Sequence, residues 1–222
     1  MKRVSLGALL VLVAVGTGIF FLGTFIWERQ QLLKIIERLT AESRIAEVLV
    51  TDVTTDPRTN TTYTTIKFLE YDARQRPLGP QYFTFRGSII QIQSLVIRFD
   101  DFYIKGGHPL KGKSAYLFMK AFSLDEPTPQ IFEINKIREV PSGYEAAGVN
   151  NNFQKRMWRK FWEYALNPQE AKRMGVKNAQ LEAPGTKFIK GMLYTVKIEH
   201  DGGMRIDAQP LPRILRGERI DF

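Results

Sequence analysis

Residues 47–72 read EVLVTDVTTDPRTNTTYTTIKFLEYD, a pattern typical of a β-rich protein. The two halves, 47–55 and 61–72, are rich in Val, Thr, Ile, Tyr and Phe, which favour half-buried strands. The DPRTN segment between them consists largely of residues that form turns. The stretch therefore predicts an antiparallel hairpin.

More strand signals follow toward the C-terminus. Residues 81–106 hold two or three strands, and Ile90 and Ile92 alternate with glutamines in the two-residue period of a strand. Residues 114–124 fit either a strand or a short helix, and residues 130–137 have strand composition. Residues 186–199 and 204–209 also have strand composition, and the HDGG turn between them indicates a hairpin. The pattern predicts a mainly antiparallel β domain.

Residues 153–166, FQKRMWRKFWEYAL, predict an amphipathic helix. At about 100° per residue, the aromatic side chains gather on one half of this helix and the basic side chains on the other. A second helix follows, with Asn167 as N-cap, Pro168 at its first position and Gly175 beyond its end. The aromatic half includes Trp158 and Trp162, and the basic half carries Lys155, Arg156, Arg159 and Lys160.

Three uses of the 153–166 helix are open. Its aromatic half can pack on the sheet, as most such helices do. Alternatively, Trp158 and Trp162 contact a membrane interface or a partner while the basic residues bind an anionic ligand. Nucleic-acid binding is the third use. A core helix predicts that Trp158→Ala unfolds the domain, whereas a docking helix predicts a folded variant that no longer binds.

The N-terminus carries no charged residue from Val4 to Trp27. At about 1.5 Å per residue this run reaches roughly 36 Å, enough to cross a hydrocarbon core of about 30 Å. A cleaved signal peptide is the alternative, but its apolar core is usually about 7–15 residues long. We expect an uncleaved anchor over 1–27. Lys2 and Arg3 favour an N-terminus inside and the bulk of the chain outside, although the two flanks differ little in Lys and Arg.

Helical periodicity continues beyond the apolar run, through the segment 28–46. One helical face of the anchor and this stalk carries small and apolar residues that let another helix approach closely. The partner would be another membrane-protein subunit or a second copy of the chain, and packing against its own domain is the alternative. The face comprises Gly7, Ala14, Gly18, Phe25, Leu32 and Leu39, and continues to Ala46.

Residues 107–114, GHPLKGKS, match the phosphate-loop pattern G-x-x-x-x-G-K-[ST]. Such a loop needs a following helix and a later buried strand that supplies an acidic magnesium ligand. The next acidic pair, Asp125 and Glu126, comes too soon for these elements, and the remaining chain predicts hairpins. A basic turn with solvated Lys111 and Lys113 is the better interpretation.

No other pattern points to catalysis. His108 and His200 fall in expected turns, and Asp100 and Asp101 are neighbours whose side chains point to opposite faces of a strand. The sequence contains neither the G-x-S-x-G motif of a serine nucleophile nor the H-E-x-x-H motif of zinc proteases, and it has no cysteine nucleophile. We therefore expect a protein that is not an enzyme and that has no cofactor and no metal.

The net charge is +9, and the chain has no cysteine. The charge favours anionic partners such as lipid headgroups, envelope polymers or acidic proteins. An extracytoplasmic location would exclude nucleic acid from this group. Disulfides and lipid attachment through cysteine are excluded.

These observations predict an α+β protein, mainly antiparallel β, with an amphipathic helix pair. The expected parts are a transmembrane anchor (1–27), a helical stalk (28–46), an extracytoplasmic β-rich domain (47–212) and a basic tail (213–222). The leading hypothesis is a single-pass, non-enzymatic assembly or scaffold subunit of a cell-envelope complex in the cytoplasmic (inner) membrane. The alternative is a membrane-tethered binding module for a phospholipid or wall polymer, and a nucleotide-binding protein is the third hypothesis.

Overall fold

The structure is a computed structural model that describes residues 6–39, 46–72, 75–99, 114–125, 127–141, 151–173, 176–198 and 203–212. The helices are α1 (Leu6–Leu39), α2 (Asn151–Leu166) and α3 (Pro168–Arg173). The strands are β1 (Ala46–Asp56), β2 (Thr61–Glu70), β3 (Gln81–Arg86), β4 (Ile89–Phe99), β5 (Ser114–Ser123), β6 (Ile131–Glu133), β7 (Val176–Glu182), β8 (Gly185–Lys187), β9 (Met192–Ile198) and β10 (Met204–Pro210).

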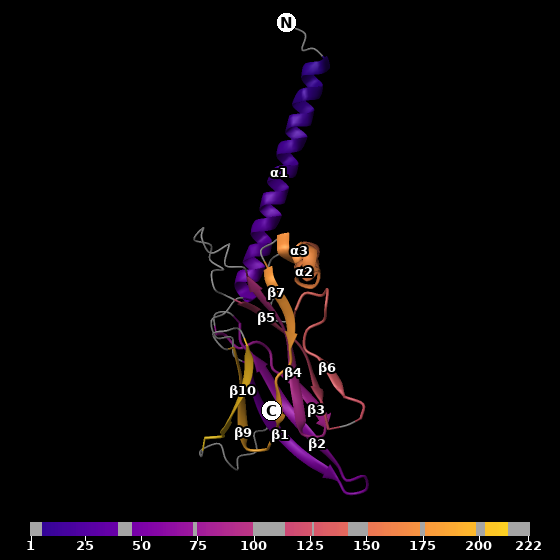
Figure 1. Cartoon of the computed structure of the whole chain (residues 1–222), viewed down its shortest axis with the longest axis vertical. Helices are drawn as coiled ribbons and strands as arrows, with labels where there is room; N and C mark the ends of the chain where they lie inside the picture. Colours follow the sequence, from indigo (N-terminus) through magenta and orange to yellow (C-terminus); the bar gives the residue numbers. More distant parts are fainter. Residues whose placement is uncertain are drawn as a thin grey trace.

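Helix α1 is one unbroken helix of 34 residues, about 50 Å long at 1.5 Å per residue. It rises away from the sheets, and its C-terminal part lies next to α2 and β5 (Figure 1). The described helix reaches Leu39, and residues 40–45 of the predicted stalk (28–46) lie outside the described ranges. Ala46 is instead the first residue of β1 and is fully buried.

The strands form two antiparallel sheets, and the predicted fold class is confirmed. One sheet has the order β10-β9-β1-β2-β3, and the other has the order β6-β5-β4-β7, with β8 paired to the beginning of β4. The predicted hairpin is β1–β2, in which Val48 lies opposite Phe68 and Ala46 opposite Glu70. Its turn spans residues 57–60, as the DPRTN signal predicts.

The main core lies between the two sheets. Buried apolar side chains from both inner faces meet there, and the rings of Phe68 and Phe118 contact edge to face at 5.2 Å between centroids. Ile90 and Ile92 are fully buried in this layer, so the two-residue period read from the sequence is confirmed. The same cluster includes Val48, Val50, Ile66, Phe85, Ala121, Phe188, Tyr194 and Val196.

The ambiguous segment 114–124 contains strand β5, which is buried on both faces. Phe118 and Ala121 belong to the core between the sheets. Leu117 and Met119 belong to a second core, where α2 covers the outer face of the same sheet. A strand buried on both sides has a continuous apolar run, so periodicity alone cannot distinguish it from a helix.

Strand β5 contains a β-bulge at Met119. The register of β4 against β5 shifts between Gln93 and Ser94, and Met119 has no partner in the β4–β5 register. The Asn135 side-chain amide donates a hydrogen bond to the Phe118 carbonyl at 2.8 Å. The backbone N–H of Asn135 also donates to the Met119 carbonyl, at 3.1 Å. The segment after β6 thus satisfies the carbonyls that the bulge exposes.

Two strand predictions need correction. The segment 130–137 contains only the three-residue strand β6, Ile131–Glu133. Strand β7 was not predicted, although it pairs with β4 along the edge of the second sheet. Its sequence, VKNAQLE, has few apolar residues, and only Ala179 and Leu181 alternate with polar ones, which is a weak strand signal.

Candidate functional site

The aromatic half of α2 packs on the outer face of the β4–β5 sheet. Trp158, Phe161 and Trp162 are buried among Leu95, Ile97, Leu117 and Met119. Adjacent rings within α2 meet edge to face, at 5.1 Å for Trp158–Phe161 and 5.5 Å for Phe161–Trp162. The indole N–H of Trp162 donates to the Glu139 carbonyl at 3.1 Å. This is the first of the three uses predicted for the helix.

The side chains of Trp158 and Trp162 are therefore not at the surface. Only 3% of Trp158 and 1% of Trp162 is exposed, so neither ring can touch a membrane or a partner in this structure. The sequence also named them as contact residues, and the structure places them in the core instead. The stable solution for two large apolar rings is burial against the sheet, which removes their surface from water.

The opposite face of α2 is basic and exposed. Lys155, Arg156 and Arg159 are exposed, and Lys160 is half-buried at the border of the face. The structure thus brings all four predicted anionic-ligand residues together on one helix surface, on the side away from the sheet.

Helix α3 follows α2 after the single residue Asn167. The Asn167 side-chain oxygen accepts the backbone N–H of Gln169 at 3.0 Å and that of Glu170 at 3.5 Å. This is the N-cap that the sequence predicts. The cap ends α2 and directs α3 back toward β7, where Ala171 joins the second core.

Helix α1 contains a segment long and apolar enough to cross a membrane. The window Leu10–Trp27 has a mean hydropathy of 2.2, and none of it is buried by the rest of the chain. Leu10, Phe20 and Phe25 each expose more than 60% of their surface. Large apolar side chains are not left in water at this density in soluble proteins. The length and composition are those of a signal anchor or of a signal sequence.

The predicted contact face of α1 lies within this single helix. Its members recur at spacings of seven and four residues, so one helical face holds them all. Gly7, Ala14, Gly18 and Phe25 are exposed, and a methyl group added at Gly7 or Gly18 would meet no atom within 4 Å. Leu32 and Leu39 lie in the part of α1 that continues toward the sheets.

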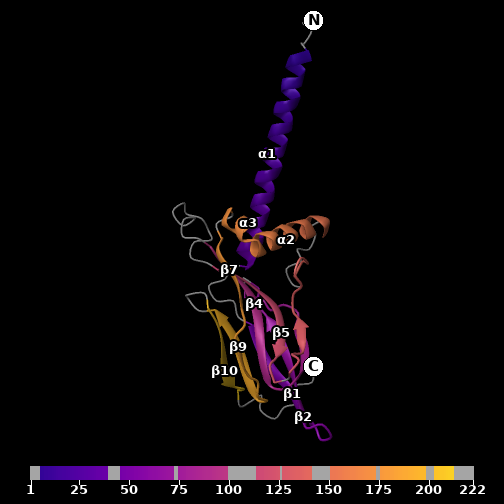
Figure 2. The same ribbon diagram turned by 45° about the vertical axis from the view of Figure 1, so that its right-hand side comes forward.

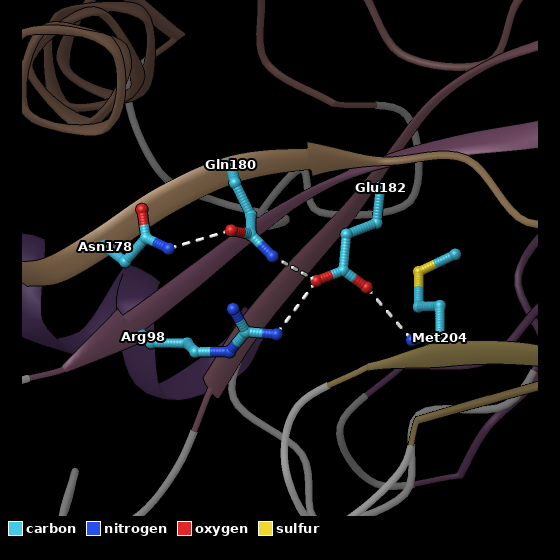
Figure 3. A network of polar contacts seen from close by, with 5 residues as sticks. All are labelled: Arg98, Asn178, Gln180, Glu182 and Met204. Carbon is cyan, nitrogen blue, oxygen red and sulfur yellow. Dashed lines mark hydrogen bonds and ion pairs between the residues drawn. The ribbon is translucent and has the colours of Figure 1, made fainter.

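A polar network joins the two sheets at one edge of the sandwich (Figure 3). Glu182, at the end of β7, accepts hydrogen bonds from the Arg98 guanidinium at 2.8 Å and from the Gln180 amide at 2.6 Å. Its other oxygen accepts the backbone N–H of Met204 in β10 at 3.0 Å. Asn178 donates to Gln180 and extends the row along β7.

This network accounts for the missed strand. Asn178, Gln180 and Glu182 occupy alternate positions of β7, so they share one face. On this face Glu182 accepts charge-assisted hydrogen bonds from Arg98 and from Met204 in the edge strand of the other sheet, and Gln180 and Asn178 extend the polar row along β7. The local sequence contains no signal for this, since Arg98 and Met204 are distant in the chain.

Two groups in the β8–β10 region have shifted pKa values. The hydrogen bond from Lys197 lowers the pKa of Asp207 below its usual 3.8, and the nearby Arg205 acts in the same direction. Burial raises the pKa of Tyr194, whose hydroxyl donates to the Lys187 carbonyl at 2.9 Å and accepts the Ile189 N–H at 2.7 Å. Both groups tie neighbouring segments together, which is a structural role.

No group of three His, Cys, Asp or Glu side chains that could hold a metal occurs within the described ranges. The loop 107–113 with Lys111 and Lys113, the residues Asp100 and Asp101, both histidines, and the basic tail 213–222 lie outside those ranges. The element that follows the loop is strand β5, which begins at Ser114, and not the helix that a phosphate loop needs, so the described residues oppose the phosphate-loop interpretation.

Comparison with known proteins adds no further assignment. No family model, no curated protein and no solved structure matches this chain. What the fold and surfaces define is a class of architecture: an apolar N-terminal helix that leads into a two-sheet β domain covered by a short helix pair.

Proposed function

We propose that this protein is a single-pass, membrane-anchored, non-enzymatic assembly or scaffold subunit of a cell-envelope complex. Helix α1 would remain attached and span the cytoplasmic membrane, with the N-terminus inside and the β domain outside. The domain would then be presented to neighbouring proteins at a constant height above the bilayer.

The continuity of α1 carries this proposal. The helix has no break from the apolar window through Leu39, and its C-terminal part lies beside α2 and β5. A cleavable signal peptide is normally followed by a short polar segment with small residues at the cleavage site. Here the apolar window is followed directly by further helix, which favours an anchor that is also part of the domain's support.

The exposed face of α1 supports interaction with other helices in the membrane. Apolar side chains there gain nothing from the hydrophobic effect once lipid surrounds them, so association relies on close packing at small residues. Gly18 sits on the predicted contact face, and a side chain there would meet no other part of the chain. Gly16 lies on the opposite face and is equally open, which makes it a matched control.

Cross-linking in native membranes tests the proposal. Because the chain has no cysteine, a photoactivatable group can be attached to a single Ala14→Cys variant. We expect an adduct of discrete mass, with a second copy or another subunit, that Gly18→Leu abolishes and Gly16→Leu preserves. Equal labelling in both variants, or a detergent-extracted protein that is strictly monomeric without partners, would contradict the proposal.

A further inference from the structure

Helix α2 lies at the end of the sheets from which α1 rises (Figure 1). In the rotated view α2 runs crosswise to α1, so it would lie along the plane of a membrane that α1 crosses (Figure 2). The two helices are neighbours in the structure. The placement brings together two segments that are more than 100 residues apart in the sequence.

The height of α2 relative to the apolar window follows from the length of α1. The window ends at Trp27, and the helix continues through Leu39, about 18 Å further at 1.5 Å per residue. Lipid headgroups extend roughly 5–8 Å beyond each side of the hydrocarbon core. Screening at physiological salt acts over about 8 Å. Helix α2 lies beside this continuation of α1, which covers the roughly 13–16 Å over which headgroups and screening together act.

Positive charge is concentrated on this helix pair. Residues 151–173 carry six basic and two acidic residues, a net charge of +4. The other described parts of the domain, 46–141 and 176–212 with their gaps, carry thirteen basic and ten acidic residues, a net charge of +3. The domain thus has one strongly basic end, and it is the end next to α1.

We propose that the basic face of α2, formed by Lys155, Arg156, Arg159 and Lys160, docks on the anionic phospholipid headgroups of the membrane that α1 spans. This inference rests on the proposed anchor. The contact is electrostatic rather than inserted, because the aromatic half of α2 is already buried against the sheet. It would hold the domain upright against the bilayer and so fix the orientation of the surfaces offered to other subunits.

The test uses the full chain reconstituted into lipid vesicles. A fluorophore on Leu166→Cys reports the position of α2, since Leu166 is 48% exposed and follows Arg159 by two helical turns. Headgroup-labelled lipid quenches the fluorophore when α2 is close to the surface. We expect stronger quenching in vesicles that contain phosphatidylglycerol than in phosphatidylcholine alone, and we expect the difference to vanish at high salt.

Two variants that each remove four positive charges distinguish an effect of the basic face of α2 from an effect of net charge. The variant K155Q/R156Q/R159Q/K160Q should lose the difference between the two lipids. The control R58Q/R86Q/K136Q/K187Q alters four exposed basic residues elsewhere on the domain and should keep it. A fluorophore on Thr59→Cys, in the β1–β2 turn, should respond to neither lipid. The unfolding midpoint of each variant, measured by tryptophan fluorescence, checks that the domain remains folded.

The two proposals fail in different ways. Protein that does not float with vesicles of either composition would contradict the anchor. Protein that floats but shows equal Leu166→Cys quenching in both lipids, or that is unaffected by the α2 variant, would overturn the docking surface alone. Tight binding of soluble dextran sulfate through the same four residues, without any lipid difference, would reassign the face to a polymer.

Discussion

At the scale of single residues, Gly87 shows why one position between β3 and β4 requires glycine. Its backbone has a φ of +88°, which side chains disfavour, and its N–H donates to the Thr62 carbonyl at 2.7 Å. The Asp125 carboxylate accepts the backbone N–H groups of Ser88 and Ile89. A methyl group on Gly87 would collide with the Asp125 side chain.

Three glycine-to-alanine variants separate these two effects. Gly79→Ala, in open space and without a positive φ, should change the free energy of unfolding by less than about 0.5 kcal/mol. Gly191→Ala, with φ +85° and open space, should cost about 1–2 kcal/mol. Gly87→Ala should cost more than Gly191→Ala, because Asp125 must move as well. Urea unfolding of the full chain in detergent measures the order.

If Gly87→Ala and Gly191→Ala lowered the free energy of unfolding equally, the contact with Asp125 would add nothing to the requirement for glycine at position 87. The sequence RGS between two strands is enough to predict a turn at Gly87. It cannot predict Asp125 as the partner, because that residue lies on the far side of β5 and no local pattern connects the two.

Glu182 is the residue through which the polar network joins the two sheets. Glu182→Ala would remove an ion-pair partner of Arg98 and the acceptor of the Met204 N–H together. We expect a loss of about 1–3 kcal/mol in unfolding free energy and faster hydrogen exchange at the Met204 amide. Glu133→Ala, at an exposed position on β6, is the control and should be nearly neutral. Unchanged exchange at Met204 would contradict this role.

At the scale of elements, helices and strands with a clear period were predicted and those without one were not. The β1–β2 hairpin and α2 each bury one side, so their apolar residues recur at two or about 3.6 residues. Strand β5 is buried on both sides, and β7 faces the other sheet with polar groups. The first arrangement leaves no period, and in β7 the alternation covers only five residues with two apolar side chains, which is too short a signal to predict a strand.

The packing of α2 gives a prediction at this scale. Trp158→Ala should destabilise the domain by about 3–5 kcal/mol, because it empties a closed site between α2 and the sheet. Leu166→Ala, on the same helix but 48% exposed, should cost less than about 1 kcal/mol. Thermal unfolding of both variants, followed by near-UV circular dichroism, makes the comparison. A folded and equally stable Trp158→Ala protein would show that α2 is not part of the core.

At the scale of the whole molecule, two sheets pack face to face, and the α2–α3 pair covers the outer face of the second sheet at the end from which α1 rises (Figure 2). The sequence predicts each half of α2 and the apolar run of α1. It contains no information on their proximity, which depends on how the sheets bring β5 and α2 to the base of α1. The proposed basic surface facing the membrane is therefore a property of the fold.

The central claim is that α1 stays attached and crosses the membrane. The most direct measurement is the intact mass of the protein recovered from the cells that make it, after the membranes have been washed with alkaline carbonate. The account predicts a chain of 25.5 kDa that remains in the washed membranes. A shorter chain that begins after the apolar helix and is released from the membranes would contradict it.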